Sequence, residues 1–124
     1  MIGKAVPLVL IPRYTTYVGE SSFTTAPLRV TEYAKAHVTL WRGPLTGSTR
    51  GGSFTAEFQV STDGDTWDNA ITAITTVNTA DNVEITLDRR WLRVKITLAV
   101  TTGSDVGITC WASGLLERRI PKEG

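Results

Sequence analysis

The sequence predicts an all-β fold, an antiparallel β-sandwich of jelly-roll-like form with about eight strands. Thr, Val and Ile are abundant whereas strong helix formers are scarce, and β-branched side chains fit a pleated surface better than a helix. Apolar and polar residues alternate over several segments, as they do in half-buried strands. Gly-, Asp- and Asn-containing turn signals separate these segments and give the spacing expected of a sandwich or barrel.

The alternation is clearest in residues 54–60, where every second residue is apolar and polar residues intervene. Residues 83–87 and 92–98 repeat this pattern. The remaining strands are expected where short apolar stretches lie between turns. We expect strands at residues 5–11, 28–33, 37–42, 54–60, 71–77, 83–87, 92–98 and 106–116, with turns at 42–44, 47–52, 63–65, 78–82 and 101–105.

The domain organisation follows from length and composition. A chain of 124 residues is long enough for one domain with a core and too short for two. We expect residues 28–117 to form the sandwich. Residues 1–27 should form an N-terminal arm or edge strand, because residues 13–27 are rich in Thr, Ser and Gly. Residues 118–124 are polar and should form a C-terminal tail.

The composition excludes several classes of partner and site. Thirteen basic and twelve acidic residues give a formal net charge of +1, which argues against nucleic-acid binding by charge. The longest apolar run, at residues 5–11, contains Pro7 and is too short for a membrane span or a complete signal peptide. One cysteine and one histidine exclude an internal disulfide and Cys- or His-rich metal sites. We therefore expect no nucleic acid, membrane, metal or cofactor.

Catalytic motifs are not recognisable in the sequence. His37 lacks the local signature of a nucleophile and its base, and Cys110 lies in an apolar strand, where a buried, inert thiol is the ordinary outcome. No phosphate-binding loop, dinucleotide-binding glycine pattern or metalloprotease motif is present. We expect a protein that is not an enzyme, with no catalytic residues.

Three of the four tryptophans occupy positions where a sandwich strand places polar residues. Trp91 is out of phase with the apolar residues that follow it, and Trp41 and Trp111 are out of phase with their own neighbours. These rings are either buried by other parts of the monomer or used as an interface or ligand platform. The candidate interface comprises Trp41, Trp91, Arg93 and Trp111.

The segment Ser-Thr-Asp-Gly-Asp-Thr-Trp-Asp at residues 61–68 has a structural and a functional interpretation. Asp-Gly is a strong hairpin-turn signal, and Trp67 can fold back onto the preceding strand. Alternatively, Asp63, Asp65 and Asp68 could form a hard-cation site, because closely spaced carboxylates suit calcium. The segment lacks the length and the terminal Glu of an EF-hand loop.

Residues 29–116 resemble small β-sandwich proteins encoded among the virion structural genes of tailed bacteriophages. The resemblance rests on the Val-Ser-Thr-Asp-Gly-Asp-Thr-Trp segment at residues 60–67, the Arg-Arg-Trp-Leu-Arg-Val-Lys-Ile-Thr segment at 89–97 and the Gly-Ile-Thr segment at 107–109. The same pair of motifs is more weakly similar to discoidin-like and carbohydrate-binding sandwiches. Discoidin domains are usually longer and carry binding loops for which this chain has no room.

The resemblance implies a multicopy capsid decoration (cement) protein or a head or tail accessory subunit. Such a subunit would be made in the host cytoplasm, reside in the virion, and bind major capsid or head/tail proteins as well as copies of itself. It would use one face of the sandwich and its terminal arms. The alternative is a glycan-binding module in which exposed Trp41 and Trp91 stack on sugar rings, while Arg93, Asp65 or Asp68 hydrogen-bond the sugar hydroxyls.

Overall fold

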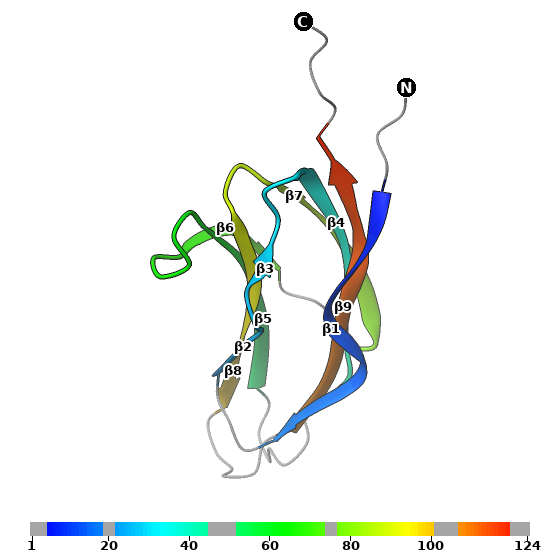
Figure 1. The fold of residues 1–124 in the computed structure, drawn as a ribbon. Coiled ribbons are helices and arrows are strands. Elements are labelled where there is room, and N and C mark those ends of the chain that lie inside the picture. Colours follow the sequence, from blue (N-terminus) through cyan, green and yellow to red (C-terminus); the bar gives the residue numbers. More distant parts are fainter. Residues whose placement is uncertain (1–4, 19–21, 45–51, 74–76, 101–106, 120–124) are drawn as a thin grey trace, which may run out of the picture.

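The computed structural model describes residues 5–18, 22–44, 52–73, 77–100 and 107–119, which form two antiparallel β-sheets packed face to face (Figure 1). This confirms the predicted all-β sandwich. The strands are β1 (Ala5–Val18), β2 (Ser22–Thr24), β3 (Leu28–Arg29), β4 (Tyr33–Arg42), β5 (Gly52–Ser61), β6 (Asp68–Ala73), β7 (Thr79–Thr86), β8 (Trp91–Val100) and β9 (Gly107–Arg118).

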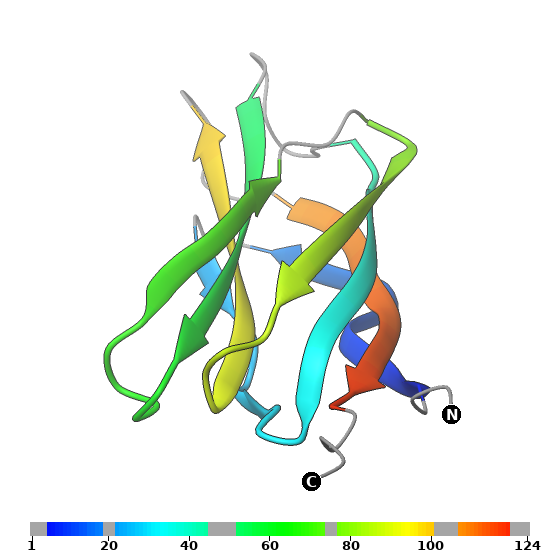
Figure 2. The same ribbon diagram turned by 90° about the horizontal axis from the view of Figure 1, so that it is seen from above.

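The strand order is that of a jelly roll. One sheet has the order β1-β9-β4-β7, and the other has the order β2-β8-β5-β6, with β3 also paired to β8. Because β2 and β3 both pair with β8, they act as one interrupted strand, which makes eight strands in the described part of the chain. The antiparallel pairs β1·β9, β2/β3·β8, β4·β7 and β5·β6 then alternate between the two sheets, as in a double-sheet jelly roll. Figure 2 shows the two sheets as separate layers.

The core lies between the sheets and is built from the alternating apolar residues. Phe54 and Phe58 on β5 are almost completely buried, as are Leu40 on β4, Ile85 on β7 and Leu92 on β8. The period-two pattern directs these side chains inward and their polar neighbours outward. Burial of these side chains is the main source of stability in a chain whose one cysteine, Cys110, is free and buried.

The N-terminal segment, expected to be an arm or an edge strand, contains the edge strand β1. Strand β1 pairs with β9 along the edge of the four-stranded sheet, and its side chains Leu8, Leu10 and Ile11 join the core. The sequence predicts a strand that ends at Ile11. Instead, β1 continues through two register shifts, because an edge strand tolerates a proline that cannot donate to the ladder.

Other boundaries also differ from the sequence-based expectations. The predicted strand at 28–33 is only the short β3, and the predicted turn at 78–82 is mostly part of β7, preceded by Asn78 at φ 60°. At the C-terminal end, β9 continues to Arg118, and Arg119 donates from its backbone N–H to Glu32 O. The expected turns at 47–52 and 101–105, and most of the expected tail, lie largely or wholly outside the described residues.

In the described part of the chain, no helix meets the length and hydropathy that crossing a membrane requires.

Candidate interaction surfaces

The four residues of the predicted interface do not form one surface. Trp41 on β4 and Trp111 on β9 point outward from the four-stranded sheet, whereas Trp91 and Arg93 on β8 point outward from the five-stranded sheet. The prediction that these aromatics point away from the core is confirmed, because each follows or precedes a buried inward residue. The four residues of the candidate interface are divided between two opposite outer faces, because β4 and β9 belong to one sheet and β8 to the other. We call the outer face of the four-stranded sheet the open face and that of the five-stranded sheet the covered face.

The open face carries a cross-strand tryptophan pair. Trp41 and Trp111 are direct register partners on β4 and β9. The guanidinium carbon of Arg13 lies 4.7 Å from the ring centroid of Trp111. Val9 and Leu115 also point outward on this face, with 58% and 48% of their surfaces exposed, and Leu115 lies four residues from Trp111 along β9. Large apolar side chains therefore line a face that would be polar in a monomeric sandwich.

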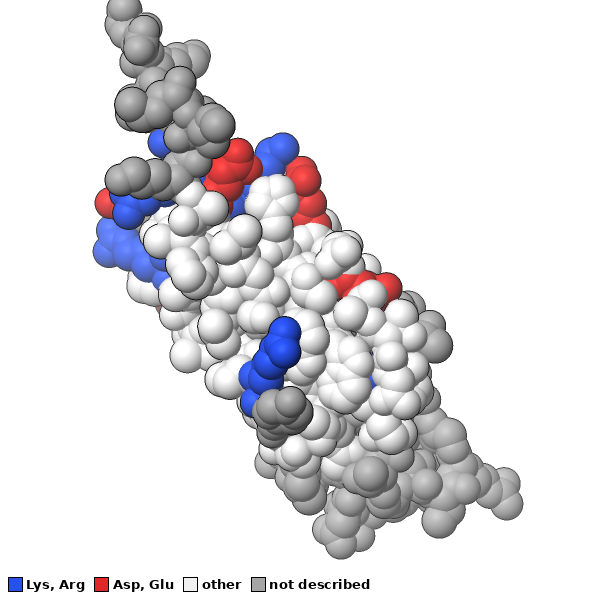
Figure 3. Space-filling view, turned by 90° about the vertical axis from the view of Figure 1, so that its right-hand side faces the viewer, with Lys and Arg blue, Asp and Glu red and all other residues white. Residues whose placement is uncertain are grey.

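Charge is unevenly distributed over the open face. Figure 3 shows this face turned toward the viewer: most of its middle is uncharged, one basic side chain stands on it, and basic and acidic residues gather at the upper end. His37 Nε2 lies 3.2 Å from Glu117 Oε2, and its Nδ1 lies 3.8 Å from Glu84 Oε2. Lys35 Nζ lies 3.1 Å from the other Glu84 oxygen. His37 is therefore part of an exposed ion-pair group on the outer side of β4.

A shallow hollow of about 430 Å³ lies on the open face between its charged and apolar parts. Outward side chains of His37, Thr39, Asn82, Glu84 and Leu115 line it, and Thr39 Oγ1 donates to Asn82 Oδ1 at 2.9 Å.

At the floor of the hollow is Gly114, where the backbone of β4 approaches β9 closely. A Cβ at Gly114 would lie 1.8 Å from the carbonyl oxygen of His37. Only glycine fits this position without moving the strands apart.

The covered face is occupied by the protein's own side chains. The Arg93 guanidinium carbon lies 4.1 Å from the ring centroid of Trp67, and Arg93 Nε donates to Gln59 Oε1 at 2.8 Å. Gln59 in turn donates from Nε2 to Glu57 Oε2 at 3.3 Å. Gln59 and Ser61 are buried although they point outward. The hairpin that follows β5 therefore folds back over this sheet, in agreement with the structural interpretation of the Trp67 segment.

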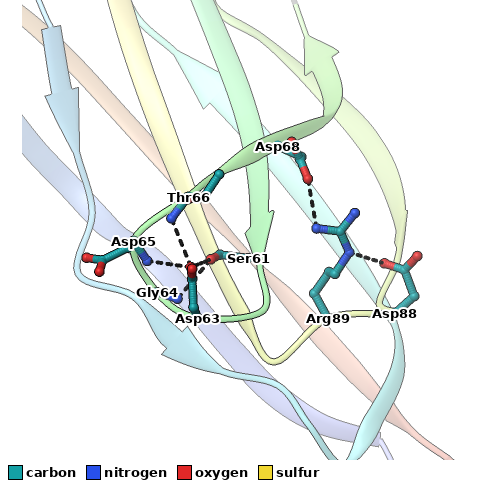
Figure 4. Close-up of polar contacts among 8 residues, drawn as sticks. All are labelled: Ser61, Asp63, Gly64, Asp65, Thr66, Asp68, Asp88 and Arg89. Atoms are coloured by element: carbon teal, nitrogen blue, oxygen red, sulfur yellow. Dashed lines mark hydrogen bonds and ion pairs between the residues drawn. The ribbon is translucent and has the colours of Figure 1, made fainter.

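The turn at residues 61–67 is organised by the carboxylate of Asp63 (Figure 4). Its Oδ1 accepts hydrogen bonds from Asp65 N–H at 2.8 Å, Thr66 N–H at 2.9 Å and Ser61 Oγ at 3.0 Å. The bond from Thr66 contributes most to lowering the pKa of Asp63 below its ordinary value, followed by those from Asp65 and Ser61. Gly64 adopts φ +82°, a conformation that favours glycine.

Two tryptophans pack around this turn. Trp67 Nε1 donates to Gly64 O at 3.2 Å. Trp91 lies against the same glycine, since a Cβ at Gly64 would be 3.7 Å from Trp91 Nε1. Trp91 is therefore partly buried by its own monomer.

The structure does not bring the three aspartates of the cation alternative together. The carboxylate of Asp63 is surrounded by donors, and the side chain of Asp65 points away from it (Figure 4). Asp68 Oδ2 pairs with Arg89 Nη1 at 2.8 Å, and this pair raises the pKa of Arg89. Within the described ranges, no group of three or more His, Cys, Asp or Glu residues is placed to hold a metal ion.

Cys110 lies on the inner side of β9 and is completely buried. Desolvation raises the pKa of its thiol to about 12, because burial disfavours the thiolate. The thiol is thus protonated at neutral pH, in agreement with the inert role predicted for it.

Sequence reasoning missed three contributors to the open face. Leu115 was assigned to a strand but not to the surface. It lies four residues after Trp111, and residues separated by an even number of positions point to the same side of a strand, so both side chains point outward. Val9 was likewise assigned to a strand but not to the surface, and Arg13 was missed because the expected strand ended at residue 11. No sequence signal marks the stacking of Arg13 on Trp111, which depends on the register between β1 and β9.

Comparison with known proteins gives a structural match only. No protein-family model matches the chain, and no curated protein matches it in sequence. The chain is similar to part of a chain in a solved structure of infectious bursal disease virus, Gx strain, with a TM-score of 0.57 and 10% sequence identity. The match covers 94% of this chain and 32% of the viral chain, so the present chain spans about a third of that chain's length. At this identity the likeness shows the fold alone: a β-sandwich that also occurs in a virus, with nothing specific to bacteriophages.

Proposed function

We propose that the chain is a non-enzymatic virion structural protein, a multicopy capsid decoration (cement) or head/tail accessory subunit of a tailed bacteriophage. The observation that carries this proposal is the open face, which carries the paired Trp41 and Trp111 as well as exposed Val9 and Leu115. An apolar surface of this kind on a small domain is typical of a protein–protein interface. The shared sandwich fold in a virus structure supports the same role.

A non-enzymatic role is supported by the surroundings of the two residues with nucleophilic or base chemistry. Cys110 is buried with a pKa of about 12, so it offers no thiolate to a substrate. His37 lies on the outer face of a sheet and contacts two glutamates, with no nucleophile among its described polar contacts. These surroundings support a role in binding for the exposed surface of the protein.

The glycan-binding alternative receives less support from the tryptophans. A sugar platform needs a ring face open to solvent. Arg13 lies over Trp111, Arg93 lies over Trp67, and the Gly64 turn packs against Trp91. Trp41 is in contact with Gly43, where an added Cβ would lie 3.3 Å from its Cη2. Each ring therefore already has a neighbour from its own chain.

The direct test is quantitative mass spectrometry of purified virions of the phage that encodes the chain. The proposal predicts that the protein is present in many copies per particle and stays bound during gradient purification. Its recovery only in the soluble fraction of the lysate would overturn the proposal. Binding of the purified protein to a panel of immobilised glycans, with no protein in the virion, would favour the glycan module instead.

A further inference from the structure

The open face contains the elements of a self-complementary interface. Its middle is apolar, with Val9 and Leu115 more exposed than any other large apolar side chains in the described part of the chain. Trp41 and Trp111 are only partly buried on the same face. Trp and Arg are the residue types that most often dominate binding energy at interfaces, and here Arg13 lies on Trp111.

Association through this face is favoured over association through the β1 edge of the sheet. Strand β1 is one of the two edge strands of the four-stranded sheet, the other being β7. It contains Pro7 and Pro12 and shifts register twice along its pairing with β9. Proline lacks the backbone N–H that would donate to an added strand, and a β-bulge twists the edge strand away from a neighbour. Both features discourage the addition of another strand. The face beside this edge lacks such protection, because its apolar side chains point directly to solvent.

The charges on the open face are arranged in two groups. Arg13 lies over the ring of Trp111, which is the register partner of Trp41. Glu84 and Glu117 flank His37, which is four residues from Trp41 along β4 and therefore about 13 Å away. Together with Lys35, these two glutamates leave a net charge of −1 when His37 is neutral, since two negative charges meet one positive charge. Arg13 is thus the positive group near the tryptophan pair, and Glu84 and Glu117 are the negative groups near His37.

We propose that the open face binds a second copy of this chain about a two-fold axis, so that Arg13 of each copy meets Glu84 of the partner subunit. The axis lies in the plane of the face and is perpendicular to the line from Arg13 to Glu84. Rotation about it brings Arg13 of one copy opposite the Glu84 position of the other. The same rotation lays the apolar middle of one copy on that of the other, as in an isologous dimer. Four strands paired over about ten residues present roughly 600 Å² in projection, which is comparable to the ~800 Å² that each partner buries in a standard interface.

This inference rests on the proposed multicopy role, which it deepens by naming the surface where copies meet. It excludes the covered face, where Arg93 and Gln59 already pack against Trp67 and each other. It also explains why the middle of the open face is apolar. Solvent alone would favour polar side chains there.

The test is sedimentation equilibrium of the full chain and a set of charge variants. The wild type should form a dimer at about 100 µM. Arg13→Glu should raise the dissociation constant roughly tenfold or more, and Glu84→Arg should do the same, because each opposes like charges at two symmetric positions. The double variant should restore association. Rescue within one monomer is excluded, because Arg13 lies on β1 and Glu84 on β7, at opposite edges of the sheet.

Two controls keep the result independent of folding. Arg90→Glu makes the same change of charge at an exposed residue in the turn before β8 and should leave the dimer unchanged. Leu115→Glu should weaken the dimer roughly 30-fold or more, whereas Thr24→Glu on exposed β2 should not. Circular dichroism should show the same strand content in all variants.

A monomeric wild type at this concentration would overturn the inference. So would equal effects of Arg13→Glu and Arg90→Glu, or a double variant weaker than either single variant. The proposed virion role fails differently, through absence of the protein from purified particles. If the double variant restores the dimer but the protein is absent from virions, the proposed interface stands and the proposed virion role is rejected.

Discussion

Trp41 and Trp111 are direct cross-strand partners on β4 and β9, and both point to the outside of the sandwich. Neighbouring strands hold directly opposite side chains close enough for aromatic rings to touch. Arg13 from β1 adds a cation above the Trp111 ring. Three strands thus contribute to one surface group that the hydrophobic core does not require.

Replacement of Trp111 by Thr should show how much this group contributes to the stability of the fold and how much it contributes to dimer formation. Thr keeps the β propensity, so the fold should persist with a loss of about 1–2 kcal/mol from the tryptophan pair and the stacked arginine. Urea unfolding measures this loss, and light scattering should show a monomer. Trp91→Thr on the covered face serves as the matched control and should leave association unchanged. If both variants dimerise like the wild type, Trp111 has no part in the interface.

Gly114→Ala should destabilise the fold by about 3 kcal/mol or more. The added Cβ would lie 1.8 Å from His37 O, which is backbone and cannot rotate away as a side chain would. The measurement is the melting temperature of Gly114→Ala compared with that of Ser113→Ala. The Ser113→Ala variant is the control, because it removes an oxygen atom and adds no bulk. A melting temperature for Gly114→Ala equal to that of Ser113→Ala would contradict the close approach of β4 and β9.

Asp63 should make stability depend on acid pH. Its pKa is lowered in the folded state, first by the N–H of Thr66, so the unfolded chain binds the proton more tightly. The stabilising contribution is complete above the unfolded pKa of about 3.9 and is lost as the pH falls through the lower folded value. Asp63→Asn should therefore be less stable than the wild type at neutral pH, and the gap should narrow at acid pH. Urea midpoints measured across this range give the answer, and a constant gap would contradict the assignment.

Cys110 should resist alkylation in the native protein. Its burial raises the pKa to about 12, whereas an unfolded thiol ionises near 8.5. Iodoacetamide should label it only after denaturation. By the same linkage, stability should decrease as the pH rises from about 8.5 towards 12, because the unfolded chain loses the proton first. Rapid labelling of the folded protein would show that the thiol is accessible.

Much of the fold could be predicted because its signals are local. Alternation at residues 54–60 and 92–98 predicted β5 and β8, and the Asp-Gly pair predicted the turn after β5. The extension of β1 beyond Pro12 could not be predicted, since it depends on pairing with a strand that lies about 90 residues later. Propensity alone disfavours a strand there, and tertiary pairing overrides it.

The candidate site could be predicted only in part. Parity showed that Trp41, Trp91 and Trp111 point outward, because period two is a property of each strand. Parity does not tell which sheet a strand joins, so Trp91 and Arg93 were grouped with residues on the opposite face. The stacking of Arg13 on Trp111 and the exposure of Val9 arise only when β1 is placed on β9.

The most direct test of the account is site-specific photo-crosslinking in purified virions, with a photo-reactive amino acid in place of Val9. Val9 is the most exposed large apolar residue of the open face, so the account predicts a covalent homodimer of this chain on illumination. The same probe in place of Thr24, on the other sheet, should give no homodimer. A homodimer from position 24 and none from position 9 would contradict the claim that copies meet through the open face.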